Sequence, residues 1–241
     1  MPRIIKSAKG TFTSATVTVD SSGRVISGES GSGGAVMTPK ITAFGPSSGT
    51  YTSNGNQMMA YASSGGGGGG GGPQSQGPNT IRGGAGGFGV VGVFTSDITP
   101  PFSQPYAVGA LGSSGNNGGA NNANNGSAGG ATSIATLFSL NGGNGGNKAP
   151  ETTNGNPGTP GTVGSGSFIG SAPTPGATNS IAGNPGPEVG SNNDMSYNRQ
   201  TIMFGTNAGI GGTGGNRTQN PTPSHTPNPG GMGALIVFDN A

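Results

Sequence analysis

The chain contains no cysteine and a single histidine among its 241 residues. Without cysteine, neither disulfides nor thiolate metal sites can reinforce a thin core. Because His225 is the only imidazole, one chain cannot assemble a His-centred catalytic triad or a multi-His metal site. The acidic residues are scattered singly along the sequence, at Asp20, Glu29, Asp97, Glu151, Glu188, Asp194 and Asp239. We therefore predict that the protein is not an enzyme and binds no cofactor and no metal ion.

Large apolar side chains and charges are also scarce. Leu, Ile, Val and Phe together supply 36 residues, too few for the layered core of a conventional α/β or helical enzyme of this length. Nine basic and seven acidic residues leave a net charge of +2, which indicates no nucleic-acid partner. No apolar run is long enough for a transmembrane helix or for a signal peptide after the basic start. We expect no membrane insertion and synthesis in a cytoplasm.

Residues 1–40 carry the pattern of a β-hairpin. Residues 15–20 alternate with period two in β-branched side chains, Ser21-Ser22-Gly23 offers turn chemistry, and residues 24–26 resume the apolar character. A single hairpin is marginally stable in water. Residues 1–40 are therefore predicted to be an N-terminal β docking segment that pairs with another chain, a neighbouring subunit or a following strand. Residues 57–62 are a second, short strand candidate.

Glycine dominates the rest of the chain, with 55 residues in total and eight in succession at 65–72. Oligoglycine by itself is typical of a flexible linker. Elsewhere, however, glycine recurs at every third position, within residues 83–92, 158–164 and 209–215. A period of three matches a left-handed extended helix with three residues per turn, in which glycine along one edge lets another backbone approach. Collagen fits poorly because the period restarts in short blocks and there are only 19 prolines.

This spacing predicts a glycine-rich polyglycine-II domain over residues 41–241. Brief helices would pack side by side, and N–H···O bonds between their backbones would replace an apolar interior. The fold class expected is mostly irregular with minor β: a short N-terminal β-hairpin or strand region, then a bundle of packed polyglycine-II helices joined by loops, with almost no α-helix. Apolar islands would cap the bundle or pack against the first strands, at residues 88–94, 134–140, 168–169, 202–204 and 235–238. The Pro-rich residues 100–106 and 221–229 are expected to be stiffened loops.

Three stretches resemble proteins of bacteriophage tails. Residues 15–25 look like a phrase that recurs in tail-fibre and appendage proteins. Residues 48–52, the glycine burst and the closing residues 231–238 resemble the glycine-rich domain of phage tail proteins, and the glycine blocks between them are similar to tail-tip adhesins built as polyglycine-II sandwiches. The resemblance implies a virion protein of the tail fibre or tail tip that binds a bacterial surface receptor, protein or glycan. It also implies contacts with other tail or fibre proteins through the N-terminal segment, and it leaves a single copy or a homotrimer open.

Receptor recognition would lie in loops that carry rigid aromatic or arginine anchors, since these residue types are enriched at binding hot spots. The candidates are Phe102, Tyr106, Tyr197, Arg199, Arg217 and His225. Two alternatives stay open at this point. One is a purely structural virion component of the baseplate, tail or head that binds only other virion proteins. The other is an ice-binding protein, which would need a flat, regular Thr or Ala face.

Overall fold

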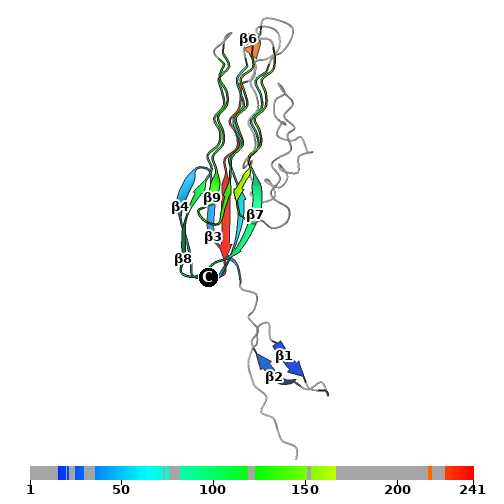
Figure 1. The fold of residues 1–241 in the computed structure, drawn as a ribbon, viewed down its shortest axis with the longest axis vertical. Coiled ribbons are helices and arrows are strands. Elements are labelled where there is room, and N and C mark those ends of the chain that lie inside the picture. Colours follow the sequence, from blue (N-terminus) through cyan, green and yellow to red (C-terminus); the bar gives the residue numbers. More distant parts are fainter. Residues whose placement is uncertain are drawn as a thin grey trace, which may run out of the picture.

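We analysed a computed structural model of the chain. The structure describes residues 16–19, 21, 25–29, 36–72, 74–75, 82–118, 123–150, 153–166, 217–218 and 226–241. Within these ranges every regular element is a β-strand, and none is a helix. The strands form one four-stranded sheet, one five-stranded sheet and two short two-stranded pairs (Figure 1).

The first pair is the predicted N-terminal hairpin. Strand β1 (Thr16–Val19) pairs antiparallel with β2 (Val25–Glu29), with a register shift between Thr18 and Val19. The hairpin is therefore confirmed. Its role as a docking segment and the boundary at residue 40 stay predictions, although the next strand, β3, already begins at Thr38.

The four-stranded sheet places the C-terminal strand in its interior. Its order is β3 (Thr38–Phe44), β13 (Ala234–Asp239), β5 (Gln57–Ser63) and β7 (Val91–Asp97), all antiparallel. Ile236 lies opposite Thr42 on one side and Tyr61 on the other. The strand predicted at residues 57–62 is confirmed as β5. Because β13 separates β3 from β5, the last residues of the chain complete this sheet.

The five-stranded sheet has the order β11 (Val163–Ser165), β10 (Phe138–Leu140), β9 (Thr132–Ile134), β8 (Phe102–Val108) and β4 (Ser47–Ser53). Strand β4 follows β3 after a two-residue bend at Gly45 and Pro46. Gly45 has a φ of +76°, a conformation that glycine adopts without the strain of a side chain. This bend carries the chain from one sheet to the other.

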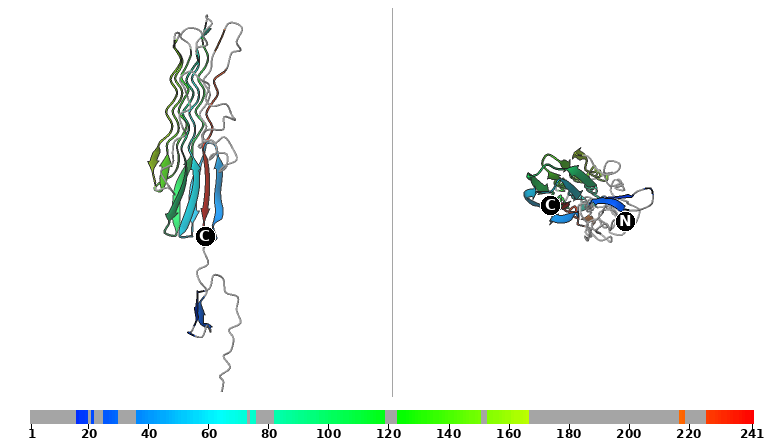
Figure 2. Two further views of the ribbon diagram at one scale, coloured as in Figure 1. Left: turned by 90° about the vertical axis from the view of Figure 1, so that its right-hand side faces the viewer. Right: turned by 90° about the horizontal axis from the view of Figure 1, so that it is seen from below.

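The two sheets stack face to face around an apolar core, as can be followed in the side view and the view from below in Figure 2. Alternate residues point inward along most of β5, so Met58, Ala60 and Ala62 are buried while Gln57, Met59 and Tyr61 are more exposed. The other large, fully buried core residues come from both sheets: Tyr51, Ile134, Phe138, Leu140, Leu235 and Val237. This arrangement is a β-sandwich.

The predicted fold class is wrong. The described chain is all β, with antiparallel sheets of four and five strands, and is not a bundle of polyglycine-II helices in a mostly irregular chain. Three apolar islands expected to cap a bundle are themselves strands of the sandwich: residues 91–94 in β7, 134–140 in β9 and β10, and 235–238 in β13. The islands at 168–169 and 202–204 lie outside the described residues. A modest number of apolar side chains suffices because they are gathered in one sandwich, with alanines filling part of it.

Extended glycine-rich segments leave the sandwich at one end, and most of them continue a strand directly (Figure 1). We refer to them together as the array. Its segments are residues 64–72, 82–90, 109–118, 123–131, 141–150, 153–162 and 226–233. Residues 64–72 form its centre and are buried along their whole length.

Backbone hydrogen bonds tie the array together, and they repeat every third residue along the central segment. The amides of Gly65, Gly68 and Gly71 donate to carbonyls of residues 124–130 at 2.9 Å. The amides between them donate to other neighbours: Gly67 and Gly70 to residues 84–87, and Gly66 and Gly69 to residues 228–231. In return, central carbonyls accept from residues 112–118 and 143–149. The N–H···O bonds predicted between glycine-rich segments are thus present, although they extend a β-sandwich.

The closeness of these backbones explains the glycine content. A Cβ atom on Gly68 would collide with the carbonyl oxygen of Ser113, and one on Gly67 would collide with that of Asn144. No side chain fits between the segments at these two positions. Glycine is therefore required here for close approach, and the backbone amides and carbonyls satisfy one another in place of water.

Two buried hydroxyl groups join the sheets to the array. Thr132 Oγ1 donates to the carbonyl of Ser63 at 2.8 Å and accepts the amide of Gly109 at 2.9 Å. Ser64 Oγ donates to the carbonyl of Asn141 at 2.9 Å and accepts the amide of Val90 at 2.7 Å. Each hydroxyl satisfies one backbone donor and one backbone acceptor where the ladder of a sheet gives way to the array.

Candidate functional site

The segments of the array end close together at the end of the molecule that lies away from the sandwich (Figure 1). We call this the distal end and define it by residues 72, 82, 116–118, 123–125, 147–150 and 153–156. The residues that join these ends, 73, 76–81, 119–122, 151–152 and 219–225, lie outside the described residues, as does 167–216. The opposite end of the sandwich, which carries the C-terminus, is called the base.

Two cations lie on adjacent segments at the distal end. The amide of Arg82 donates to Asn154 Oδ1 at 3.0 Å, and the carbonyl of Arg82 accepts the amide of Gly155 at 2.8 Å. The amide of Gly84 donates to the carbonyl of Asn147 at 2.8 Å, which places the start of segment 82–90 beside the residue that precedes Lys148. Arg82 is half-buried, and Lys148 is exposed.

Asparagine side chains hold the segment ends in place here. Asn125 Oδ1 accepts the amide of Lys148 at 2.7 Å, and Asn117 Oδ1 accepts the amide of Gly72 at 2.9 Å. These amides satisfy backbone donors where the segments end, which is the turn chemistry for which asparagine is suited. The distal end is consequently lined by amide groups and by two cations.

A short parallel pair also lies at the distal end, where Figure 1 labels β6. Strand β6 (Gln74–Ser75) pairs with β12 (Arg217–Thr218), and Arg217 lies opposite Gln74. Of the predicted receptor-binding residues, Arg217 is the one whose backbone lies at the distal end. Tyr197, Arg199 and His225 lie outside the described residues.

Phe102 and Tyr106 lie in the sandwich and not in a display loop. Both belong to strand β8 and pack against the core from positions that share one face of the strand. The Phe102 ring lies 5.6 Å from that of Tyr51, and the Tyr106 ring fills the space that a Cβ atom on Gly49 would need. The prediction of a Pro-stiffened loop over residues 100–106 is therefore wrong from Phe102 onward. Period-two placement of Phe102, Tyr106 and Val108 decides the structure despite the intervening proline.

Sequence reasoning missed Arg82 and Lys148 as site residues. They stand 66 positions apart in the sequence, Arg82 directly before Gly83 and Lys148 two residues after Gly146. Each residue stands at one boundary of a glycine-rich block, where the composition of the chain changes. These two boundaries can be assigned to the same end of the molecule only when the segments are known to run antiparallel.

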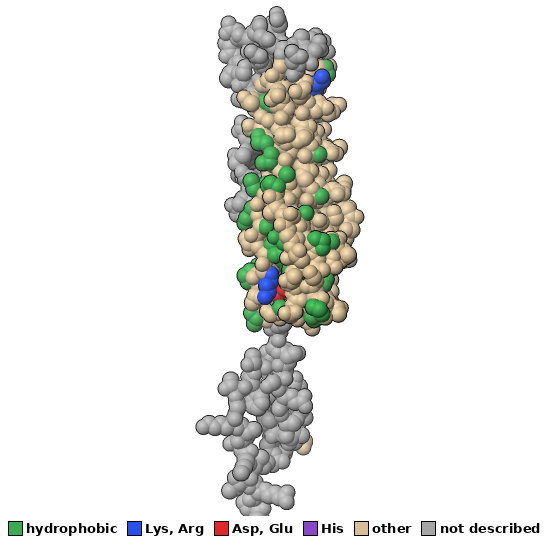
Figure 3. Space-filling model, turned by 90° about the vertical axis from the view of Figure 1, so that its left-hand side faces the viewer, with side chains coloured by type: hydrophobic (Ala, Val, Ile, Leu, Met, Phe, Trp, Pro, Cys, Tyr) green, Lys and Arg blue, Asp and Glu red, His purple; other side chains and the backbone are tan. Residues whose placement is uncertain are grey.

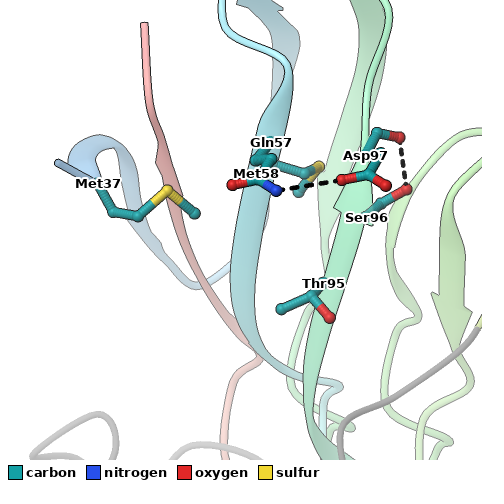
Figure 4. A pocket seen from close by; sticks show the side chains of 6 residues that line it. All are labelled: Met37, Gln57, Met58, Thr95, Ser96 and Asp97. Atoms are coloured by element: carbon teal, nitrogen blue, oxygen red, sulfur yellow. Dashed lines mark hydrogen bonds between the residues drawn. The ribbon is translucent and has the colours of Figure 1, made fainter. Parts of the chain in front are cut away.

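A shallow hollow of about 350 Å³ lies beside strands β5 and β7, near the base (Figure 4). It is lined by Met37, Gln57, Met58, Thr95, Ser96 and Asp97. Asp97 is its only ionisable side chain, and Gln57 Nε2 donates to Asp97 Oδ1 at 3.4 Å. Thr95 and Ser96 add two hydroxyl groups to the lining, and Ser96 Oγ donates to the backbone carbonyl of Asp97 at 2.9 Å. No histidine that could activate a hydroxyl group is among the described lining residues.

A buried carboxylate fastens the C-terminal strand at the base. Asp239 is fully buried and accepts hydrogen bonds from the Tyr51 hydroxyl at 3.0 Å and from the amide of Ala241 at 3.1 Å, while Lys40 Nζ lies 3.4 Å from it. Burial by itself would raise the pKa of Asp239, but the hydrogen bonds from Ser53, Ala241 and Tyr51 and the charge of Lys40 together lower it below its ordinary value. Burial in turn raises the pKa of Tyr51. This cluster joins β13 to β4 and to β3 and stabilises the fold.

Within the part of the chain that the structure describes, no three His, Cys, Asp or Glu side chains gather where they could hold a metal ion. The same residues contain no helix that could cross a membrane. A comparison with protein-family models gives no match, and a comparison with curated proteins gives none either.

Proposed function

We propose that the chain is a bacteriophage virion protein of the tail fibre or tail tip that binds the host-cell surface through its distal end. The observation that supports this proposal is the architecture of the array. Its segments are hydrogen-bonded side by side and end together at the distal end, far from the sandwich. A scaffold of this kind holds loops in fixed positions while their sequences vary.

The N-terminal segment would serve attachment to the virion. In the two-stranded sheet of β1 and β2, the outer edge of each strand pairs with no other described strand, so a strand of another tail or fibre protein could pair there. Attachment through the N-terminal segment is compatible with a single copy of the chain at the end of a fibre and with a homotrimer. The chain would be made in the host cytoplasm and act as part of the virion tail.

Adsorption to host cells tests the proposal directly. A short peptide tag inserted after Asn121, between the distal ends at Gly118 and Ala123, should abolish or reduce adsorption of the particle. The same tag inserted after Thr99, an exposed residue between β7 and β8, is the matched control and should leave adsorption unchanged. The purified chain should also compete with particles for cells.

The second candidate is a purely structural virion component of the baseplate, tail or head. It predicts normal adsorption for both insertions and loss of assembled particles when the sandwich is destabilised. An antibody against the chain, located on the particle by electron microscopy, separates the candidates by position. Label on the head or on the baseplate away from the fibres would overturn the first proposal.

A further inference from the structure

Charge is unevenly distributed along the molecule. The described carboxylates of the sandwich lie toward the base, at the ends of their strands: Asp97 in β7 and Asp239 in β13. Lys40 lies there too and pairs with Asp239. Arg82 and Lys148 lie at the opposite, distal end. On the face drawn in Figure 3 most of the surface is neither charged nor hydrophobic, and cationic side chains are seen near both ends. Among the described residues of the distal end no acidic residue occurs.

The distal cations are not neutralised by a described carboxylate. The ion pair between Lys40 and Asp239 is the one formed among the described residues, and neither Arg82 nor Lys148 takes part in one. Both belong to segments whose backbones are fixed by hydrogen bonds to Asn154 and Asn125. Arg217 adds a third cationic residue at this end by the position of its backbone. Cations that no described carboxylate neutralises, held on a rigid support, are suited to an anionic ligand.

We propose that the distal end binds an anionic glycan, a polysaccharide that carries phosphate or carboxylate groups. The inference rests on the proposed function and names the chemistry of the receptor. An arginine guanidinium presents paired donors to one phosphate or carboxylate, and a lysine ammonium adds a point charge. The surrounding asparagine amides supply donors and acceptors for sugar hydroxyl groups. A ligand that is both charged and rich in hydroxyl groups matches this combination better than an apolar protein surface does.

The attraction must be local, because the whole chain carries a net charge of only +2. At physiological salt the screening length is about 8 Å, so charges at the base contribute little at the distal end. Binding should therefore depend on the cations of the distal end, Arg82 and Lys148 among them, and not on cations at the base or in the N-terminal segment. It should also weaken as ionic strength rises.

Binding of the full chain to defined polysaccharides provides the test. The probes are polygalacturonate, which carries carboxylates, yeast phosphomannan, which carries phosphodiesters, and neutral dextran. The chain is expected to bind one or both acidic polymers and not dextran, and which polymer binds identifies the anionic group. The double variant R82Q/K148Q should bind about three- to tenfold more weakly, the effect of losing two surface ion pairs with the ligand.

Two further variants make the test specific. K6Q/K9Q removes the same number of positive charges from the N-terminal segment and should bind as tightly as the unmodified chain. E151Q removes the acidic residue that follows Lys148 most closely in the sequence and should strengthen binding. Thermal melting of each variant verifies that the fold is retained.

Equal binding of R82Q/K148Q and K6Q/K9Q, or equal binding of dextran and the acidic polymers, would overturn the anionic-glycan proposal. That result is distinguishable from failure of the proposed function. If the distal insertion after Asn121 still abolishes adsorption, the display role stands and only the ligand class is wrong. If the insertion has no effect on adsorption, the display role itself is wrong.

Discussion

Replacing Gly68 by alanine adds one carbon atom at the centre of the array. The new Cβ atom would collide with the carbonyl oxygen of Ser113, so the segments must move apart. Such a shift stretches two hydrogen bonds of Gly68, from its amide to Ser127 and from the amide of Gly146 to its carbonyl, both 2.9 Å long. These bonds contribute about 1–3 kcal/mol together, and overpacking costs about 1–3 kcal/mol more.

Alanine also restricts the unfolded chain, which offsets roughly 0.4–1 kcal/mol of that loss. We therefore expect G68A to lower the free energy of unfolding by about 2–4 kcal/mol. For a chain of this size the melting temperature should fall by roughly 5–15 °C. Differential scanning calorimetry on the purified chain measures this change.

The matched control is G164A. Gly164 is an exposed residue of β11, and the nearest atoms to an added Cβ are the ends of two side chains, Ser139 Oγ at 3.3 Å and Asn141 Nδ2 at 3.4 Å. Both can move aside, so this variant should melt within about 3 °C of the unmodified chain. If G68A melts within about 2 °C of G164A, then the backbones of the array are not packed as closely as described, and the reasoning fails.

Three further predictions concern the sandwich. T132V should lower the free energy of unfolding by about 2–4 kcal/mol in denaturant titrations, because valine removes the hydroxyl that accepts the buried amide of Gly109 and donates to the carbonyl of Ser63. The folded-state pKa of Asp239 is lowered, so its contribution to stability is complete above its ordinary pKa of 3.8 and is lost as the pH falls below that value toward the folded-state pKa. Y51F, which removes one donor to this carboxylate, should be less stable at pH 7 and lose less stability on acidification; melting curves from pH 7 to pH 2.5 check both statements. Y106A should lower the melting temperature yet leave adsorption by folded particles unchanged, whereas reduced adsorption at unchanged stability would restore Tyr106 as a receptor-binding residue.

Local sequence patterns predicted local structure well. The alternation in residues 15–20 and the turn residues after it correctly gave the β1–β2 hairpin, and residues 57–62 correctly gave β5. Both signals lie within a single element or between neighbouring ones. The three-residue glycine spacing likewise indicated that backbones approach and hydrogen-bond, which the array shows.

The sandwich could not be predicted in the same way because its strands pair across long stretches of glycine. Ile236 pairs with Thr42, a partner 194 positions earlier, and neither residue's neighbourhood identifies the other. Strand β8 was hidden by its proline, and Ala60 and Ala62 were not recognised as core residues because alanine is small. The apolar residues were expected to be too few for a layered core. A core forms nevertheless, because alternate residues along the strands point inward and bring these side chains together.

The distal site was beyond prediction for a related reason. Arg82 and Lys148 come together only because backbone hydrogen bonds set segment 82–90 beside segment 141–150. Neither residue lies in a recognisable motif. Their sequence positions become informative once the course of the array assigns both to the same end.

Amide hydrogen exchange of the central segment tests the array most directly. Glycine-labelled protein allows the amides of Gly65, Gly68 and Gly71 to be followed by NMR in the folded chain. Each donates a 2.9 Å hydrogen bond inside a fully buried segment, so these amides should exchange only through large-scale unfolding, as slowly as the amides of β5. Exchange at the rate of an unstructured glycine peptide, while β5 stays protected, would show that the array does not form and would remove the support for a displayed distal end.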